Sequence, residues 1–224
     1  MSLDPEIARQ NMIQQQIRCW DVTQGDVLDT LRSVPREHFV APEYISLAFA
    51  DTRLPLEADS DDAQTLMTPA LEGRVLQALE LSPDDRVLEI GTGSGYLTAC
   101  LARLAGFVTS IEISAPRAER ASARLAELGV TNCDIQVQDV FARNATDTFD
   151  AIAVTGSLPT YDPRFEAWLN PGGRAFLMVG TGAMQEALRV RRTNGGVVRR
   201  ESLFETFIAP LVNTTRPPSG EFRL

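Results

Sequence analysis

Three glycines at alternate positions, Gly91, Gly93 and Gly95, are the residues of this sequence best suited to holding a cofactor. They follow a short apolar segment and precede a segment with helical spacing, so a strand-to-helix turn is predicted there. Glycine turns tightly and lets a ligand approach without meeting a Cβ atom. In a dinucleotide fingerprint the last glycine comes one residue later, because the pyrophosphate must sit on the helix N-terminus. The spacing therefore favours a cofactor without a pyrophosphate, held by Gly91, Thr92, Gly93, Ser94 and Gly95.

Acidic residues at the ends of neighbouring predicted strands extend this site. Glu89 comes two residues before the glycine loop, and Glu112 ends the second predicted strand. A carboxylate at that strand end can accept hydrogen bonds from both hydroxyls of a ribose, as the acidic residue of dinucleotide folds does. Asp139 follows the third strand, within reach of an adenine amino group. With the adjacent Ile113 and Val140, these residues predict a site for a nucleotide or S-adenosylmethionine.

The elements that must position these residues alternate between strand and helix from residue 86 onward. The predicted strands are 87–90, 107–113, 135–137, 151–154 and 175–179, and the predicted helices are 96–104 and 115–128. This alternation is typical of an α/β fold with a Rossmann-like, mostly parallel and doubly wound sheet. Residues 193–196 read as the turn of a C-terminal β-hairpin, and residues 197–211 read as two strands joined near 199–202.

The N-terminal part of the chain has a different pattern. Residues 4–18 and 23–34 carry helical spacing, and residues 51–67 are polar and aperiodic, which is typical of a lid or binding loop. Thr68 and Pro69 are suited to begin another helix. We expect an N-terminal helical segment with a lid, residues 1–80, packed on the same domain, then a cofactor-binding domain, residues 81–211, and a tail, residues 212–224.

Composition excludes several classes of partner. The net charge of −9 disfavours nucleic acid, because binding to phosphates is driven by cationic side chains. No apolar stretch approaches the roughly 20 residues that span a bilayer, and the N-terminus lacks a secretory pattern. Three cysteines without metal-like spacing and a single histidine predict reduced thiols and no metal site. These features indicate a cytoplasmic protein without a membrane partner, and they leave the oligomeric state open.

Several segments together resemble the protein-L-isoaspartate O-methyltransferase family of class I S-adenosylmethionine-dependent methyltransferases. Glu89 with the glycine loop matches the E-x-G-x-G-x-G pattern of class I methyltransferases. The resemblance runs from about residue 8 to residue 211. The matching segments are V-P-R-E-H-F-V at 34–40, Tyr44 with D-T-R-L-P at 51–55, Gln64-Thr65 with Pro69, V-L-E-I-G-T-G-S-G-Y at 87–96, P-G-G-R at 171–174 and F-I-A-P-L at 207–211.

The resemblance implies a protein repair activity. Such an enzyme transfers a methyl group from S-adenosylmethionine to the free carboxylate of an isoaspartyl residue in a protein or peptide and leaves S-adenosylhomocysteine. A carboxylate is already anionic at neutral pH, so this chemistry needs no general base. Catalysis can come from alignment of the reacting atoms and from exclusion of water. The resemblance implies no individual catalytic residue in this chain.

The substrate half of the family pattern is altered. Where the family's Q-T-I-S-x-P motif places a serine beside the reacting groups, this chain has Met67, whose thioether cannot donate a hydrogen bond. Thr65, Met67 and Thr68 are the residues expected in the lid near the methyl group. Asp59, Asp61 and Asp62 fill the lid, and carboxylates there repel an anionic substrate.

Three hypotheses follow from this contrast. The first is methylation of a protein or peptide carboxylate, with isoaspartate as the family's acceptor. The second keeps the cofactor but has a different acceptor. The third is a binding module that holds S-adenosylmethionine or S-adenosylhomocysteine without turnover.

Overall fold

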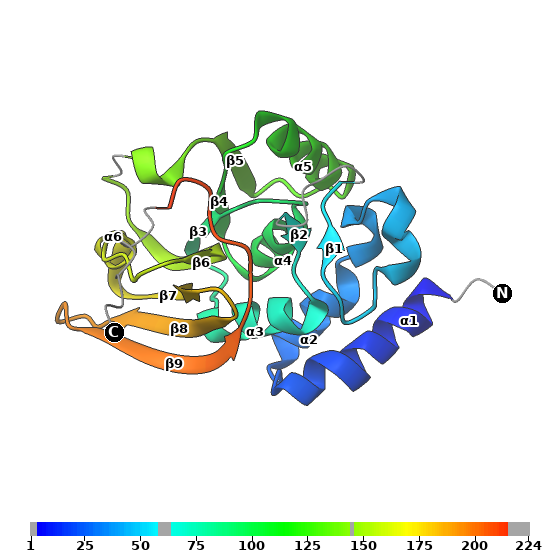
Figure 1. Cartoon of the computed structure of the whole chain (residues 1–224), viewed down its shortest axis with the longest axis horizontal. Coiled ribbons are helices and arrows are strands. Elements are labelled where there is room, and N and C mark those ends of the chain that lie inside the picture. Colours follow the sequence, from blue (N-terminus) through cyan, green and yellow to red (C-terminus); the bar gives the residue numbers. More distant parts are fainter. Residues whose placement is uncertain (1–3, 58–63, 144–145, 215–224) are drawn as a thin grey trace, which may run out of the picture.

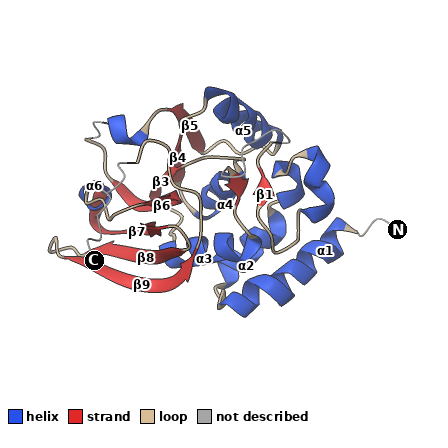
Figure 2. Cartoon of the chain, in the orientation of Figure 1, coloured by secondary structure: helices blue, strands red, loops and turns tan. Residues whose placement is uncertain are grey.

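A sheet of seven strands forms the centre of the molecule in the computed structural model, which describes residues 4–57, 64–143 and 146–214. The spatial order is β5-β4-β3-β6-β7-β8-β9 (Figures 1 and 2). The bounds are β3 Arg86–Ile90, β4 Phe107–Glu112, β5 Cys133–Val137, β6 Phe149–Leu158, β7 Leu169–Thr181, β8 Met184–Arg192 and β9 Val198–Thr206. Strands β3 to β7 pair in parallel, and β7, β8 and β9 pair antiparallel. The Rossmann-like, mostly parallel sheet expected from the sequence is confirmed.

Both faces of the sheet are covered. On β3, Val87 packs into one apolar cluster and Leu88 into the other, as alternation along a strand requires. The first cluster joins the sheet to the N-terminal helices, and the second joins it to Phe165 and Trp168, which lie between β6 and β7. Strands buried on both faces are continuous apolar runs, which is why the central strands were easy to predict.

The helices lie close to their predicted positions. Those that follow β3 and β4 are α4 Tyr96–Leu104 and α5 Ala115–Glu127, and α6 is Arg164–Ala167. The helices of the N-terminal part are α1 Pro5–Met12, α2 Gly25–Ser33 and α3 Pro69–Leu79. Between them lie a π-helical turn, Ile13–Ile17, and the 3₁₀ turns Arg18–Trp20, Arg36–Phe39 and Pro42–Leu47. A further 3₁₀ turn, Val140–Ala142, follows β5. Residues of α1, α2 and α3 share the first apolar cluster with the sheet. The N-terminal segment is therefore packed on the same core as the sheet.

Two details differ from the sequence-based expectation. The segment predicted as a loop over 51–67 contains two short antiparallel strands, β1 Leu54–Pro55 and β2 Thr65–Leu66. Residues 59, 61 and 62, the expected acidic lid positions, lie outside the described residues. The prediction of two strands within 197–211 was wrong, because β9 continues through 199–202 as one strand paired with β8. The hairpin turn at 193–196 joins these two strands, as predicted.

The C-terminal segment returns to the carboxyl ends of the central strands. After β9 the chain (red in Figure 1) runs back over the sheet, and Pro210 forms an isolated bridge with Ser157 of β6. Its last described residue is 214, so most of the predicted tail lies outside the described part of the chain. Among the described residues, no helix is both long and apolar enough to cross a membrane.

Candidate active site

A pocket lies at the carboxyl ends of β3, β4 and β5. This is the edge at which open α/β sheets bind ligands, next to the point where the strand order reverses between β3 and β6. Ten of the expected site residues line it: Thr65, Met67, Gly91, Thr92, Gly93, Ser94, Glu112, Ile113, Asp139 and Val140. Three others, Thr68, Glu89 and Gly95, do not line it.

The glycine loop has a backbone that only glycine adopts without strain. Gly91, Gly93 and Gly95 have φ angles of +96°, +56° and +90°. A Cβ atom on Gly91 would lie 2.3 Å from Thr155 Oγ1 of β6, whereas one on Gly95 would lie 3.2 Å from the Cβ atom of Ala121. Gly91 and Gly93 therefore shape the floor of the pocket, and Gly95 allows α4 to start close to α5.

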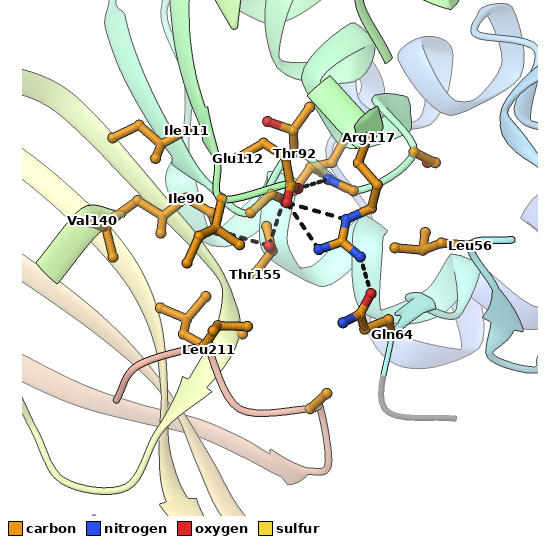
Figure 3. Close-up of a pocket in the computed structure, with 18 of the residues that line it drawn as sticks. Leu56, Gln64, Ile90, Thr92, Ile111, Glu112, Arg117, Val140, Thr155 and Leu211 are labelled. Atoms are coloured by element: carbon orange, nitrogen blue, oxygen red, sulfur yellow. Dashed lines mark hydrogen bonds and ion pairs between the residues drawn. The ribbon is translucent and has the colours of Figure 1, made fainter. Parts of the chain in front are cut away.

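Glu112 projects into the pocket from the end of β4 and is held by several donors. Its Oε2 accepts from the Gly93 N–H at 3.0 Å, and its Oε1 accepts from the Ser114 N–H at 3.0 Å and from Arg117 Nε at 3.2 Å. Figure 3 shows Arg117 between Glu112 and Gln64, whose Oε1 accepts from Arg117 Nη1. Gln64 directly precedes β2, so Arg117 links the expected ribose ligand to the lid.

Asp139 occupies the equivalent place after β5. Its Oδ1 accepts from the Phe141 N–H at 2.8 Å, which caps the 3₁₀ turn, and its Oδ2 accepts from Asn213 Nδ2 at 2.9 Å. Asn213 therefore places a side-chain amide on the carboxylate expected to bind an adenine amino group. Val212 lines the same pocket, so the first residues of the predicted tail belong to the site.

Glu89 lies below the glycine loop and is fully buried. Its Oε2 accepts from Thr98 Oγ1 at 2.5 Å and from Ser110 Oγ at 2.6 Å, and Ser110 Oγ lies 2.6 Å from Thr92 Oγ1. Each hydroxyl has a single proton, so Ser110 donates to Glu89 and Thr92 donates to Ser110. Glu89 thus anchors the glycine loop through Thr92 rather than facing the pocket.

Burial raises the pKa of Glu89 to about 7, although the two hydroxyl hydrogen bonds favour the ionised form. The folded protein therefore binds a proton that the unfolded chain releases near pH 4.5, and Glu89 lowers the free energy of unfolding as pH rises from about 5 to 7. A Glu89→Gln variant, which stays neutral, should gain stability relative to the wild type over that range, by about 1–3 kcal/mol at pH 8. Urea unfolding at pH 5 and pH 8 measures the difference. A variant effect of equal size at both values would contradict the assignment.

Met67, at the position where the family resemblance places a serine, lines the pocket. It is buried, and its carbonyl oxygen accepts from Arg36 Nη2 at 2.7 Å. Thr68 does not line the pocket, so it does not substitute for the missing hydroxyl; it is the N-cap of α3, and its side chain accepts from the Leu71 N–H at 3.4 Å. Arg36 also contacts Glu72 Oε2, and Glu72 lines the pocket.

Sequence reasoning missed Arg117, Glu72 and Thr155 as lining residues. A signal existed for Glu72, because its spacing to Val75, Leu76 and Leu79 places a carboxylate on the buried stripe of α3. No comparable pattern marks Arg117, whose contact depends on how α5 leaves β4. The described residues contain no group of three or more side chains suited to a metal ion.

Comparison with known proteins decides the family. The family model of protein-L-isoaspartate(D-aspartate) O-methyltransferase matches residues 7–216. A protein-L-isoaspartate O-methyltransferase of Anaeromyxobacter dehalogenans is 39% identical over 196 residues, covering 86% of this chain and 91% of the relative. One from Trichlorobacter lovleyi is 36% identical and covers 92% and 94%. The chain belongs to the protein-L-isoaspartate O-methyltransferase family.

Solved structures agree with this family at the level of fold. A protein-L-isoaspartate O-methyltransferase from Plasmodium falciparum in complex with S-adenosyl-L-homocysteine has a TM-score of 0.75 at 18% identity and covers 93% of this chain and 99% of that chain. A second protein-L-isoaspartate O-methyltransferase has a TM-score of 0.78 at 23% identity, covering 91% and 65%. Membership of this family confirms the resemblance, the methyltransferase class and the S-adenosylmethionine cofactor expected from the sequence.

Proposed function

We propose that this chain transfers the methyl group of S-adenosylmethionine to the free carboxylate of an isoaspartyl residue in a protein or peptide. The proposal rests on two observations: the chain belongs to this family, and the residues expected to bind the cofactor line one pocket in a definite order. Because β5, β4 and β3 are adjacent in that order, Asp139, Glu112 and the glycine loop follow one another across the sheet edge. This order matches the adenine, ribose and methionine parts of the cofactor.

Glu112 cannot receive the ribose without a change at Arg117. A carboxylate offers about four acceptor positions. Three are used here, by the Gly93 N–H, the Ser114 N–H and Arg117 Nε. Two ribose hydroxyls need two positions, and the backbone donors are fixed by the loop and by the start of α5. We therefore expect Arg117 to leave Glu112 when the cofactor binds.

Methyl transfer to a carboxylate requires the protein mainly to place the reacting groups. When bound, S-adenosylmethionine supplies a methyl group on a positively charged sulfur. A carboxylate oxygen forms the new bond to the methyl carbon while the carbon–sulfur bond breaks, and the electron pair stays on sulfur. No proton moves, so a site without a general base is sufficient. Met67, Leu66 and Leu56 line the pocket and provide apolar surface that excludes water from the reacting atoms.

The altered lid sequence favours a second candidate function, in which the methyl group goes to a different carboxylate. Met67 replaces the hydroxyl that the family motif places beside the reacting groups, and Thr68 is engaged as a helix cap. A carboxylate acceptor other than isoaspartate is the second candidate on this ground. In either case the substrate is a protein, a peptide or a smaller carboxylate, and nucleic acid is not proposed as a partner. We place the activity in the cytoplasm, where reduced thiols persist, because the three cysteines are free.

Transfer of labelled methyl groups to a pair of peptides tests the proposal. The peptides share one sequence and differ only in an isoaspartyl or an aspartyl residue at one position. We expect base-labile label on the isoaspartyl peptide and background on the aspartyl peptide. Label on a different carboxylate, with none on the isoaspartyl peptide, would support the second candidate. Binding of S-adenosylhomocysteine without transfer to any acceptor would show a non-catalytic module.

A further inference from the structure

Glu72 is a buried acid in the wall of the candidate active site. It lies in the first turn of α3, its side chain is fully buried, and it lines the pocket. Its Oε2 is bound by Arg36 Nη1. Arg36 is itself held in place, since Nε donates to the Ala48 carbonyl at 2.8 Å and Nη2 donates to the Met67 carbonyl at 2.7 Å. The pair is therefore a fixed feature of the wall.

The second carboxylate oxygen of Glu72 has no partner. Among the described residues, Oε1 is buried and receives no hydrogen bond. A buried polar atom left without a partner costs about 1–3 kcal/mol, and structures rarely retain one without a reason. Because Glu72 lines the pocket, a ligand that brings a donor to this carboxylate would satisfy Oε1.

The charges of the pocket indicate which donor. Of the described residues, three carboxylates line it, Asp139, Glu112 and Glu72, and one cation, Arg117. The proposed function assigns Asp139 to the adenine and Glu112 to the ribose, which leaves Glu72. The remaining part of S-adenosylmethionine with N–H groups is its methionine ammonium. The carboxylate of an isoaspartyl residue brings no donor, and the amide N–H groups of its peptide are neutral, so the ammonium is the ligand group that supplies both donors and a positive charge.

We propose that Glu72 binds the α-ammonium group of the cofactor through Oε1, and that this contact sets the affinity for the amino-acid part of the cofactor. The inference rests on the proposed function, because it takes S-adenosylmethionine as the occupant. Arg36 then has a positioning role: it holds Oε2 and so aims Oε1. In this arrangement Arg36 binds Oε2 and the ammonium group binds Oε1, so both carboxylate oxygens have partners only when the cofactor is bound.

This contact makes cofactor binding depend on pH. Burial raises the pKa of Glu72 to about 8, against the opposing effect of Arg36. The charge of Glu72 also raises the pKa of Tyr96 and Cys100 of α4, and burial raises both pKa values far enough to keep these groups neutral at pH 6–8. In the empty pocket burial favours the protonated carboxyl, with the proton on Oε1 because Oε2 accepts from Arg36. An ammonium ligand favours the ionised form, in which Oε1 is free to accept. Affinity for the cofactor should therefore rise with pH from 6 to 8, by more than about tenfold.

Calorimetry with two ligands tests the inference on the full chain. S-adenosylhomocysteine carries the ammonium group, and 5′-methylthioadenosine has the adenosine and sulfur but lacks the amino-acid part. For the wild type we expect affinity for S-adenosylhomocysteine to rise with pH from 6 to 8 and affinity for 5′-methylthioadenosine to stay flat. Glu72→Gln should weaken the first ligand about tenfold or more, remove its pH dependence and leave the second ligand unchanged. Glu119→Gln, on the exposed side of α5, is the matched control and should change neither.

The outcomes separate this inference from the proposed function. If the wild type binds neither ligand, the proposed cofactor site is wrong. If it binds both with the same flat pH profile, the site stands and the role of Glu72 is overturned. An equal loss of both ligands in Glu72→Gln would show that Glu72 only maintains the fold. The wild-type pH profiles require no variant, so they decide the question even where Glu72→Gln does not fold.

Discussion

Glu112→Ala should weaken S-adenosylhomocysteine binding by about 10- to 100-fold, because hydrogen bonds to a charged group contribute about 1.5–3 kcal/mol. The variant removes the expected acceptor of both ribose hydroxyls. It also removes the partner of the Gly93 N–H, so the loop that floors the pocket loses a contact. Calorimetry or equilibrium dialysis with the purified chain measures the change.

Glu119→Ala is the matched control for this result. Glu119 lies on α5 and is exposed, and its replacement should leave the affinity unchanged. Thermal unfolding of both variants separates lost binding from lost folding. Wild-type affinity in a folded Glu112→Ala protein would show that the ribose is bound elsewhere.

Gly91→Ala should lower the free energy of unfolding and reduce cofactor affinity together. The φ angle of +96° costs a residue with a Cβ atom about 1–2 kcal/mol. The added Cβ atom would also lie 2.3 Å from Thr155 Oγ1, which lies 2.8 Å from the carbonyl oxygens of both Ile90 and Gly91 and shares its one proton between them. The loop must move to relieve this contact, so we expect a total loss of about 3 kcal/mol or more and at least tenfold weaker binding.

Gly129→Ala measures the cost of a positive φ angle without a steric contact. Gly129 also has a positive φ, +70°, but a Cβ atom there would meet nothing within 4 Å. It should cost about 1–2 kcal/mol and leave cofactor affinity unchanged. Adding Thr155→Ala to Gly91→Ala removes the clashing oxygen and should recover part of the lost stability. Equal unfolding free energies for Gly91→Ala and Gly129→Ala would contradict the close contact with Thr155.

The sheet and the cofactor loop were predictable because their signals are local. Buried parallel strands are continuous apolar runs, and Gly91, Gly93 and Gly95 mark a turn that needs positive φ angles. Glu112 and Asp139 were found because strand ends in a parallel sheet meet at one edge. Each of these inferences depends on residues within a few positions of one another.

What the sequence could not reveal depends on distant contacts. Glu89 was expected to bind the cofactor because it precedes the loop, but strand alternation turns its side chain into the interior, towards Thr98 and Ser110. Arg117 joins Glu112 to Gln64 across 53 residues of sequence. The Arg36–Glu72 pair spans 36 residues. Such pairings arise only when the N-terminal segment packs on the sheet, and no local pattern records them.

The departures from the family pattern concern the acceptor rather than the cofactor. Met67 occupies the position of the family serine, and its backbone, not its side chain, is tied to Arg36. Glu72, whose polar group is a carboxyl rather than a hydroxyl, lines the same pocket as Met67. If Glu72 is engaged by the cofactor, the acceptor carboxylate must be held by other donors, among them Arg117 once it has left Glu112.

A crystal structure of the full chain with S-adenosylhomocysteine and an isoaspartyl peptide would show whether both substrates meet in this pocket. We expect the adenine amino group at Asp139, both ribose hydroxyls on Glu112, and Arg117 displaced from that carboxylate. We expect the homocysteine sulfur beside Met67, with the peptide carboxylate facing it from the position of the transferred methyl group. A ligand bound outside this pocket, or a peptide carboxylate that does not face the sulfur, would contradict the proposed methyl transfer.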